Sequence, residues 1–391
     1  MSDAPVHHID RAAFAADPYP DLARMRARAP IAFVPELGAT LFTRRDDIFV
    51  QEKRIDVFSA AQPQGLMTRL IGENMVRKDG AEHQAERRIV FPALSPRTVR
   101  QHWTPRFRAA CEAVLDDLAP RGQGDLVADF AIPVTGAALC AMTGLVNMTP
   151  TRMDAVSQAM IDGFGNYAGD ADIETRCHAA TAEIDARITE RMADLARAPD
   201  PSVLSVQMQA GLDEASTRAN VKLVIAGGHN EPRAAIAGTA WALLAHPDAL
   251  EAVRGAGASW GQAFDEYARL IAPIGTATRR VARRDRVNGV TFEPEDQVIF
   301  MFRSANRDEA YFADPDRYDI RRDTGPALTF GAGPHFCLGA AAARSLITEV
   351  ALPMLFDRLA GLELAGEVPF HGWAFRGPTR VPVRWPVRWH A

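Results

Sequence analysis

The order of apolar and polar positions divides the chain into a long helical stretch and shorter segments with strand character. From about residue 97 to residue 255, apolar residues recur every three or four positions, as in "RFRAACEAVLDDLA", which predicts amphipathic helices. Residues 31–48 predict a pair of strands followed by a helix start. Residues 282–304 show a strand pattern around Asn288-Gly289, a dipeptide typical of a tight hairpin turn. The fold class expected is therefore mainly α with a smaller β-rich part.

Composition and charge narrow the class of protein. The chain has 391 residues, 47% of them hydrophobic, and no repeat or low-complexity linker divides it, so we expect a single domain over residues 1–391. The net charge is −5 and no dense run of Lys and Arg occurs, which argues against nucleic acid or an anionic membrane as a partner. No signal peptide and no apolar stretch of about 18 residues is evident, so a cytoplasmic protein without a membrane span is expected.

One cysteine has an unusual setting. The four cysteines are far apart and form no CxxC pair, which argues against a disulfide framework or a zinc ribbon. Cys337 lies in "LTFGAGPHFCLGAAAAR", where Gly331 and Gly333 permit a tight turn close to a flat ligand. The helix start that follows favours a thiolate, which is suited to be an axial ligand of haem iron. The alternative is a buried structural cysteine.

The loop around Cys337 has a longer pattern that resembles the haem-binding loop of the cytochrome P450 family. The matching positions in residues 328–341 are Phe330-Gly331-x-Gly333-x-His335-x-Cys337-Leu338-Gly339-x-Ala341. The resemblance runs from about residue 17 to the end and implies the cytochrome P450 fold as a single haem domain. It also implies heme b (iron protoporphyrin IX), ligated by the Cys337 thiolate and contacted by Phe330 and His335.

An upstream Glu-x-x-Arg pair extends the resemblance. Glu266 and Arg269 share a helix face and are similar to the family's K-helix pair, which is buried and locks the loop under the haem. Three arginines are candidates to complete this ion network: Arg307, Arg317 and Arg322.

The resemblance also implies residues that bind the haem propionates. "DGAEHQAERRIVFPALSP" resembles the family's propionate-binding helix, in which His83 and Arg87 stand four apart on one face. From the residues alone, a solvated charged helix is the alternative. Arg280 matches a third propionate contact, and His335 adds a further donor to balance a buried dianion.

The segment "VIAGGHNEPRAAIAGTAWALLAHPDAL" resembles the family's long central helix, expected over about residues 220–250, but departs from its usual pattern. His229 stands where most members have an acid, Asn230 where they have a threonine, and Glu231 follows. Asn230 can donate a hydrogen bond to bound oxygen, and His229 or Glu231 can feed a chain of waters with protons. The alternative for His229 is a residue bonded elsewhere on the helix. Pro232 predicts a kink, with a groove for dioxygen and water.

Two further segments suggest a subgroup and a substrate. The Asn-Glu-Pro run and the tail motif "GWAFRGPT" resemble a bacterial subgroup with aryl-ether O-demethylases and reductase-fused members. The resemblance implies O-demethylation or hydroxylation of a small aromatic substrate, with Phe375 lining the pocket. Phe164 is a second candidate contact, although a phenylalanine at helical spacing is also typical of plain core.

The resemblance implies a monooxygenase that uses dioxygen and outside electrons. No cluster spacing or flavin segment is evident, so we expect a separate ferredoxin or a flavin/iron–sulfur reductase as partner. We expect it to dock on the cysteine side of the haem, where four basic residues are candidates: Arg100, Arg106, Arg108 and Arg344. Two other functions stay open because the usual acid and threonine are missing. One is a peroxide-driven peroxygenase, and the other is a non-catalytic haem protein that binds or senses a ligand.

Overall fold

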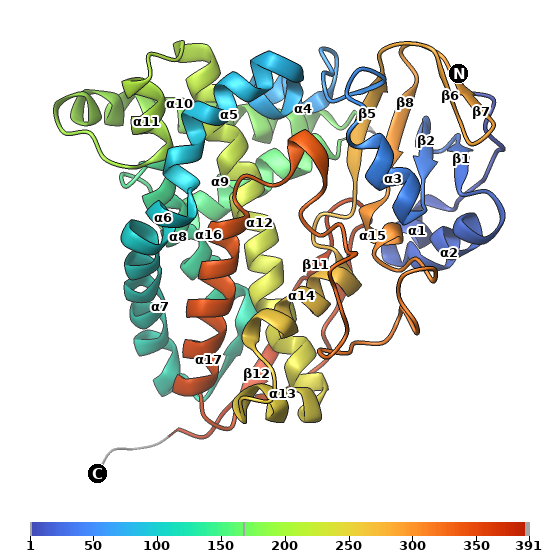
Figure 1. Ribbon diagram of the computed structural model, residues 1–391. Helices are drawn as coiled ribbons and strands as arrows, with labels where there is room; N and C mark the ends of the chain where they lie inside the picture. Colours follow the sequence, from blue (N-terminus) through green and yellow to red (C-terminus); the bar gives the residue numbers. More distant parts are fainter. Residues whose placement is uncertain (1, 167–168, 388–391) are drawn as a thin grey trace. The chain divides into compact units, whose positions relative to one another are not determined.

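The computed structural model describes residues 2–166 and 169–387. The chain folds into two compact units, and each is assembled from three separate segments of sequence (Figure 1). The first unit consists of Met1–Gln62, Trp241–Cys337 and Val368–Thr379. The second consists of Pro63–Ala240, Leu338–Glu367 and Arg380–Ala391. The segments of the two units therefore alternate along the chain, and the expected single domain stays a prediction.

A five-stranded sheet forms the centre of the first unit. Its strands, in spatial order, are β1 (Ile31–Val34), β2 (Ala39–Phe42), β8 (Gln297–Phe300), β5 (Ala277–Val281) and β3 (Phe58–Ser59). Strands β2 and β8 pair in parallel, and all other pairs are antiparallel. Four phenylalanine rings with neighbouring centroids 5.4–5.7 Å apart pack on one face: Phe42, Phe58, Phe292 and Phe300. Buried aromatic area of this kind accounts for the stability of a small sheet.

The predicted strand pair and hairpin are confirmed. Strands β1 and β2 precede helix α3 (Arg45–Gln51). Strands β6 (Asp285–Val287) and β7 (Val290–Phe292) pair across Asn288 and Gly289, whose φ angles are 49° and 88°. A two-residue turn with both φ angles positive matches the right-handed twist of the strands, and Asn-Gly tolerates it.

Short helices and two short strands complete the first unit. They are α1 (Arg11–Ala16), α2 (Tyr19–Arg28), α13 (Pro247–Arg254), α14 (Trp260–Ile271), α15 (Phe302–Ala305), the 3-10 helix η5 (Gly333–His335), β10 (Phe370–His371) and β11 (Gly377–Pro378). A capping box between Ser259 and Gln262 begins α14.

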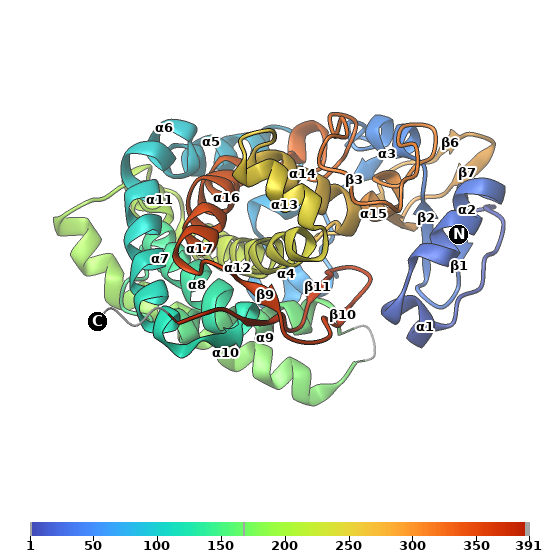
Figure 2. The same ribbon diagram turned by 90° about the horizontal axis from the view of Figure 1, so that it is seen from below.

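The second unit is mainly helical. Its helices are α4 (Leu66–Ile71), η1 (Met75–Arg77), α5 (Gly80–Leu94), α6 (Pro96–Thr98), η2 (Val99–Trp103), α7 (Thr104–Leu118), η3 (Ala119–Arg121), η4 (Leu126–Ala131), α8 (Ile132–Thr143), α9 (Pro150–Phe164), α10 (Ala171–Arg197), α11 (Val203–Gln209), α16 (Ala340–Arg344), η6 (Ser345–Ala351) and α17 (Leu352–Arg358). Helix α8 packs on α7 and α9, and α9 packs on α10 (Figure 2). A small sheet has the order β4 (Gln123–Asp125), β12 (Pro382–Arg384) and β9 (Glu363–Leu364).

The long central helix is α12 (Glu214–Ala245), so the expected bounds of about 220–250 are wrong at both ends. It ends before His246 because Pro247 occupies the first turn of α13 and cannot continue the preceding helix. Pro232 lies inside α12 and does not end it. The kink and the groove expected at this proline stay predictions.

One expectation about apolar segments is corrected. The stretch Leu126–Thr143 is long and apolar enough to cross a membrane by length and composition, although no such stretch was expected. About two thirds of it is buried inside the protein (67%), as in the core helix of a soluble protein. The burial comes from its packing against neighbouring helices, which the sequence pattern alone does not reveal.

Candidate active site

The thiol of Cys337 differs from the other three thiols in its exposure. Burial raises the pKa of Cys111 to about 12, and that of Cys140 and of Cys177 to about 11. Cys337 is exposed, so it is the one thiol of the four that an external ligand can reach. The alternative of a buried structural cysteine is therefore wrong for this position.

The backbone of the loop explains its glycines. Gly331 and Gly333 have φ angles of 71° and 63°, which residues with a side chain rarely adopt. A Cβ at Gly333 would lie 2.9 Å from the carbonyl oxygen of Glu52. The Cys337 N–H donates to the carbonyl of Phe330 over 3.0 Å and closes the turn. An exposed cysteine on a turn held in this way fits the thiolate ligand of a haem iron.

The first unit brings the predicted Glu-x-x-Arg pair together in a buried network. Glu266 and Arg269 are both 0% exposed, and the Arg269 Nε lies 2.7 Å from the Glu266 Oε2. Of the three candidate arginines, Arg322 joins the pair, with its Nε 3.1 Å from the Glu266 Oε1. The backbone N–H of Asp319 also donates to this oxygen. The Arg269 Nη1 donates to the carbonyl of Asn306.

Asn306 connects this network to the cysteine loop. Its side-chain oxygen accepts a hydrogen bond of 2.6 Å from the backbone N–H of Leu328, where the loop begins. Arg307 instead bonds the carbonyl of Leu270 and Asp316. The guanidinium of Arg317 pairs with Asp319. The ion network thus holds the start of the loop through one buried amide.

The predicted propionate contacts are divided between the units. In the first unit, Arg280 donates to the carbonyl of Ala61 over 3.0 Å and pairs with Glu295, whose side chain is 71% exposed. An exposed ion pair is weak, so Arg280 can exchange this partner for another carboxylate. In the second unit, His83 is buried and Arg87 half-buried on α5, four residues apart as expected. Their role toward propionates stays a prediction.

In the second unit, two of the predicted catalytic side chains are bonded to the neighbouring helices. The His229 ring is 0% exposed, with its Nδ1 2.8 Å from the Thr135 hydroxyl of α8 and its Nε2 2.9 Å from Asp154 of α9. The Asn230 amide donates to the Ser157 hydroxyl of α9 over 3.1 Å. These contacts favour the alternative for His229, a residue bonded elsewhere on the helix. Burial lowers the pKa of His229.

Arg233 completes this face of α12. Its guanidinium bonds Asp154, Gln158 and the side-chain oxygen of Asn230. Asp154 is therefore shared by His229 and Arg233, which together lower its pKa against the effect of its own burial. This face is an ordered polar contact between α12 and α9.

Glu231 points away from that contact. Successive helical residues are about 100° apart, so Glu231 is about 200° from His229 around α12. Both of its carboxylate oxygens are buried, and neither has a hydrogen-bond partner among the described residues. Burial raises the pKa of Glu231 to about 7. A carboxyl group in this state holds a proton near neutral pH and can release it.

The two predicted substrate contacts lie in different units. Phe375 is half-buried in the first unit, where it forms an isolated antiparallel bridge with Ile274. Phe164 is the last residue of α9 in the second unit and is 8% exposed. Its burial favours the core alternative, whereas Phe375 is only half-buried.

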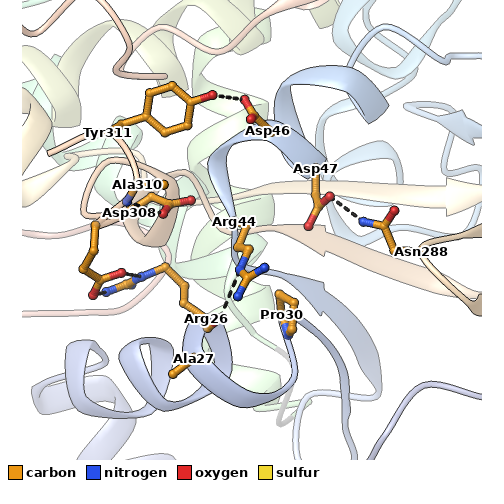
Figure 3. Close-up of a pocket in the computed structure, with 11 residues that line it drawn as sticks. Arg26, Ala27, Pro30, Arg44, Asp46, Asp47, Asn288, Asp308, Ala310 and Tyr311 are labelled. Atoms are coloured by element: carbon orange, nitrogen blue, oxygen red, sulfur yellow. Dashed lines mark hydrogen bonds and ion pairs between the residues drawn. The ribbon is translucent and has the colours of Figure 1, made fainter.

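A separate surface cleft of about 670 Å³ occurs in the first unit (Figure 3). Several of its charged lining residues bond other lining residues: Arg26 pairs with Glu309, and Asp47 accepts a hydrogen bond from Asn288. No residue of the cysteine loop lines it. The cleft therefore does not belong to the candidate active site.

Several residues of the site were not found by sequence reasoning. Asp154, Thr135 and Ser157 are distant in sequence from α12, and each looks like an ordinary polar position of its own helix. Arg303, which contacts the loops around Ile274 and Phe375, gave no signal either. Only the tertiary structure brings these side chains to the site.

Comparisons with known proteins agree with this geometry. A family model described as cytochrome P450 matches residues 261–358, which include the Glu266–Arg269 pair and Cys337. The chain is 30% identical over 363 residues to 20-oxo-5-O-mycaminosyltylactone 23-monooxygenase of Streptomyces fradiae, covering 88% of this chain and 83% of that one. It is 30% identical over 322 residues to nocardicin C N-oxygenase of Nocardia uniformis subsp. tsuyamanensis, covering 79% and 78%.

Solved structures show the same fold. A crystal structure of a myxobacterial cytochrome P450 in complex with myristic acid superposes with a TM-score of 0.86 and 26% identity, covering 97% of this chain and 98% of that one. The mainly helical architecture with small sheets is thus shared over almost the whole length of both chains.

Proposed function

The chain belongs to the cytochrome P450 family of haem-thiolate monooxygenases, and we propose that it oxidises a small aromatic substrate by O-demethylation or hydroxylation. The observation that carries the proposal is the exposed Cys337 on a tight turn, in a chain whose other thiols are buried. A haem b bound by this thiolate supplies the reductive activation of dioxygen.

The protein's own residues would hold the ligand, the proton and the substrate. The Glu266–Arg269–Arg322 network and Asn306 would keep the Cys337 loop in its turn. Glu231 would hold a proton on its carboxyl group and donate it as dioxygen is reduced, because its pKa is near 7 and its oxygens are unpaired. We infer that Glu231, rather than His229, is the acid.

The proposal of an aromatic substrate depends on two apolar side chains. Phe375 and Ile274 present partly exposed apolar surface in adjoining segments, which suits a flat ring. The names of the two relatives refer to different compounds, so these relatives do not indicate which substrate this chain oxidises. In O-demethylation, one oxygen atom of dioxygen enters the methyl group and the other leaves as water, with two electrons and two protons consumed. The hemiacetal then breaks into a phenol and formaldehyde.

Electrons would come from a separate ferredoxin or flavin/iron–sulfur reductase. Four exposed arginines of the second unit lie on η2, α7 and α16 and would offer positive charge to it: Arg100, Arg106, Arg108 and Arg344. We further propose a cytoplasmic location, because the span-like stretch Leu126–Thr143 is mostly buried as a core helix.

A turnover assay tests the proposal. The purified holoenzyme is given NADH, a ferredoxin and its reductase with anisole, 2-methoxyphenol or a methoxybenzoate. The phenolic product of each substrate, and the formaldehyde that only O-demethylation releases, are measured against NADH consumed. Product in step with NADH supports the proposal. Product only with hydrogen peroxide would favour a peroxygenase, to which the bonded His229 and Asn230 already point. A substrate-induced spectral change without product from either oxidant would favour a ligand-binding role.

A further inference from the structure

A fully buried arginine bonds the backbone of both segments that carry the proposed substrate contacts. Arg303 is on α15 and is 0% exposed. Its Nη2 donates to the carbonyl of Ala272 over 2.8 Å, and its Nη1 to the carbonyl of Gly372 over 3.3 Å. Among the described residues, no carboxylate bonds this guanidinium. Burial lowers the pKa of Arg303 to about 10, so the side chain is still a cation at neutral pH.

The end of α14 explains why a cation is stable there. The last carbonyls of a helix have no partner within the helix and carry partial negative charge. Arg303 bonds the carbonyl of Ala272, Arg307 bonds that of Leu270 over 2.8 Å, and the Tyr19 hydroxyl donates to Leu270 and Ile271. Backbone carbonyls thus replace the missing carboxylate.

The same guanidinium joins two turns that are almost 100 residues apart in sequence. The turns, residues 272–276 and 372–376, are paired by the Gly275 N–H to the Ala374 carbonyl over 2.8 Å and by the Arg376 N–H to the Pro273 carbonyl over 3.0 Å. Ile274 and Phe375 are opposite each other in this pairing. Arg303 bonds one carbonyl in each turn, and its backbone N–H also donates to the carbonyl of Gly275.

Close packing leaves the guanidinium little freedom. A Cβ at Gly275 would lie 2.5 Å from the Nε and Nη2 of Arg303, so the guanidinium lies directly against this glycine. Gly372 has a φ of 93°, and a Cβ there would collide with the carbonyl oxygen of Phe375. Arg376 donates a second hydrogen bond to the Gly372 carbonyl, over 3.1 Å. Both turns are therefore held at their glycines.

We infer that Arg303 is a positioning residue that fixes the Ile274–Phe375 pair, and through it the affinity and orientation of the substrate. The inference rests on the proposed function, because it takes this pair as the surface that the substrate meets. Ile274 is 36% exposed although it is a large apolar side chain, and Phe375 is half-buried beside it. A shift of about 1 Å at such a surface can change the rate by as much as about a hundredfold.

The test compares the holoenzyme with its Arg303→Met and Arg303→Lys variants. Arg26→Met is the matched control, since Arg26 is also a buried arginine of the first unit, but bonds Ser304 and Glu309 rather than the two turns. Hydrogen exchange is measured in peptides that cover the two turns, and the Kd for anisole is measured from its spectral shift. Arg303→Met is expected to speed exchange in both turns and to weaken anisole binding about tenfold, with Arg303→Lys in between.

The control separates positioning from general stability. Arg26→Met is expected to lower Tm yet keep exchange in the turns and the Kd for anisole within about twofold of the wild type. If Arg303→Met behaves like Arg26→Met, the inference is wrong. If Arg303→Met does not fold, the test uses Arg303→Lys. Exchange rates and an anisole Kd equal to those of the wild type in that variant would overturn the inference. If the wild type binds no methoxyarene, the proposed substrate is wrong. The hydrogen-exchange rates of the two turns would still test whether Arg303 positions them.

Discussion

Two glutamates with buried carboxylate oxygens have opposite surroundings. Glu266 in the first unit accepts from Arg269, Arg322 and the Asp319 backbone N–H, so its charge is fully matched. Glu231 in the second unit is half-buried overall, but both of its carboxylate oxygens are buried and have no hydrogen-bond partner among the residues that the structure describes. Both carboxylates are therefore shielded from water, and only that of Glu266 is bonded to cations.

This difference indicates a structural role for Glu266 and a role in proton transfer for Glu231. Two arginines stabilise Glu266 as an anion and tie α14 to the segment before the cysteine loop. Burial destabilises the anion of Glu231 more than the nearby Arg233 stabilises it, so its pKa rises to about 7 and the group exchanges protons near neutral pH. Perturbed and unpaired carboxyl groups of this kind are typical of functional sites.

The largest effect is expected from Glu266→Gln. The substitution leaves the buried Arg269 and the half-buried Arg322 without their anion, and breaking a buried ion pair destabilises a protein by about 3–5 kcal/mol. The free energy of unfolding and the haem content after purification measure it. Arg317→Gln is the control, because its ion pair with Asp319 is exposed and worth less than about 1 kcal/mol. Equal losses in both variants would contradict a structural role for the buried network.

Glu231→Gln should slow turnover in the folded enzyme. Loss of a general acid lowers the rate by about a hundredfold or more. In the wild type the rate should fall as pH rises above about 7, because the donor loses its proton, and this limb should vanish in the variant. Glu214→Gln, an exposed position at the start of the same helix, is the control and should keep the wild-type profile. An unchanged rate and pH profile in Glu231→Gln would remove Glu231 from the mechanism.

The same residue should make folding stability depend on pH. The folded-state pKa is raised from 4.5 to about 7, so the stabilisation is fully present below pH 4.5 and is lost as pH rises to about 7. The difference amounts to a loss on the order of 3 kcal/mol. Unfolding free energies of wild type and Glu231→Gln, measured from pH 5 to pH 8, should diverge, with the variant the more stable at high pH. Parallel curves would mean that Glu231 is solvated.

The smallest effect is expected from His229→Gln. It disturbs a hydrogen bond and the contact with Asp154, which lowers the free energy of unfolding by about 1–2 kcal/mol. Turnover per folded enzyme should change far less than in Glu231→Gln. Should the histidine variant lose turnover and the glutamate variant keep it, the two faces of α12 have been assigned the wrong way round.

The sequence predicts what depends on local spacing. The hairpin at Asn288-Gly289 follows from two positive φ angles that few residues tolerate, and the turn before Cys337 from Gly331 and Gly333. Glu266 and Arg269 are neighbours on one helix face, so their pairing needs no tertiary information.

Contacts between distant helices are beyond such reasoning. Nothing near His229 in sequence indicates that Asp154 and Thr135 bond its ring, since the approach of α8 and α9 to α12 decides it. The same holds for Arg303, whose partners Ala272 and Gly372 are main-chain carbonyls and leave no side-chain signature. Likewise, only the tertiary structure shows that the Glu231 carboxylate has no hydrogen-bond partner among the described residues.

The central claim, that the Cys337 thiolate binds the haem iron, is tested by the absorption spectrum of the reduced protein under carbon monoxide. The wild type should show the red-shifted Soret band of thiolate ligation. Cys337→Ser should lose that band, while Cys140→Ser, at a buried thiol, should keep it wherever the protein folds. A wild type that carries no haem, or a Cys337→Ser variant with the wild-type spectrum, would contradict the account.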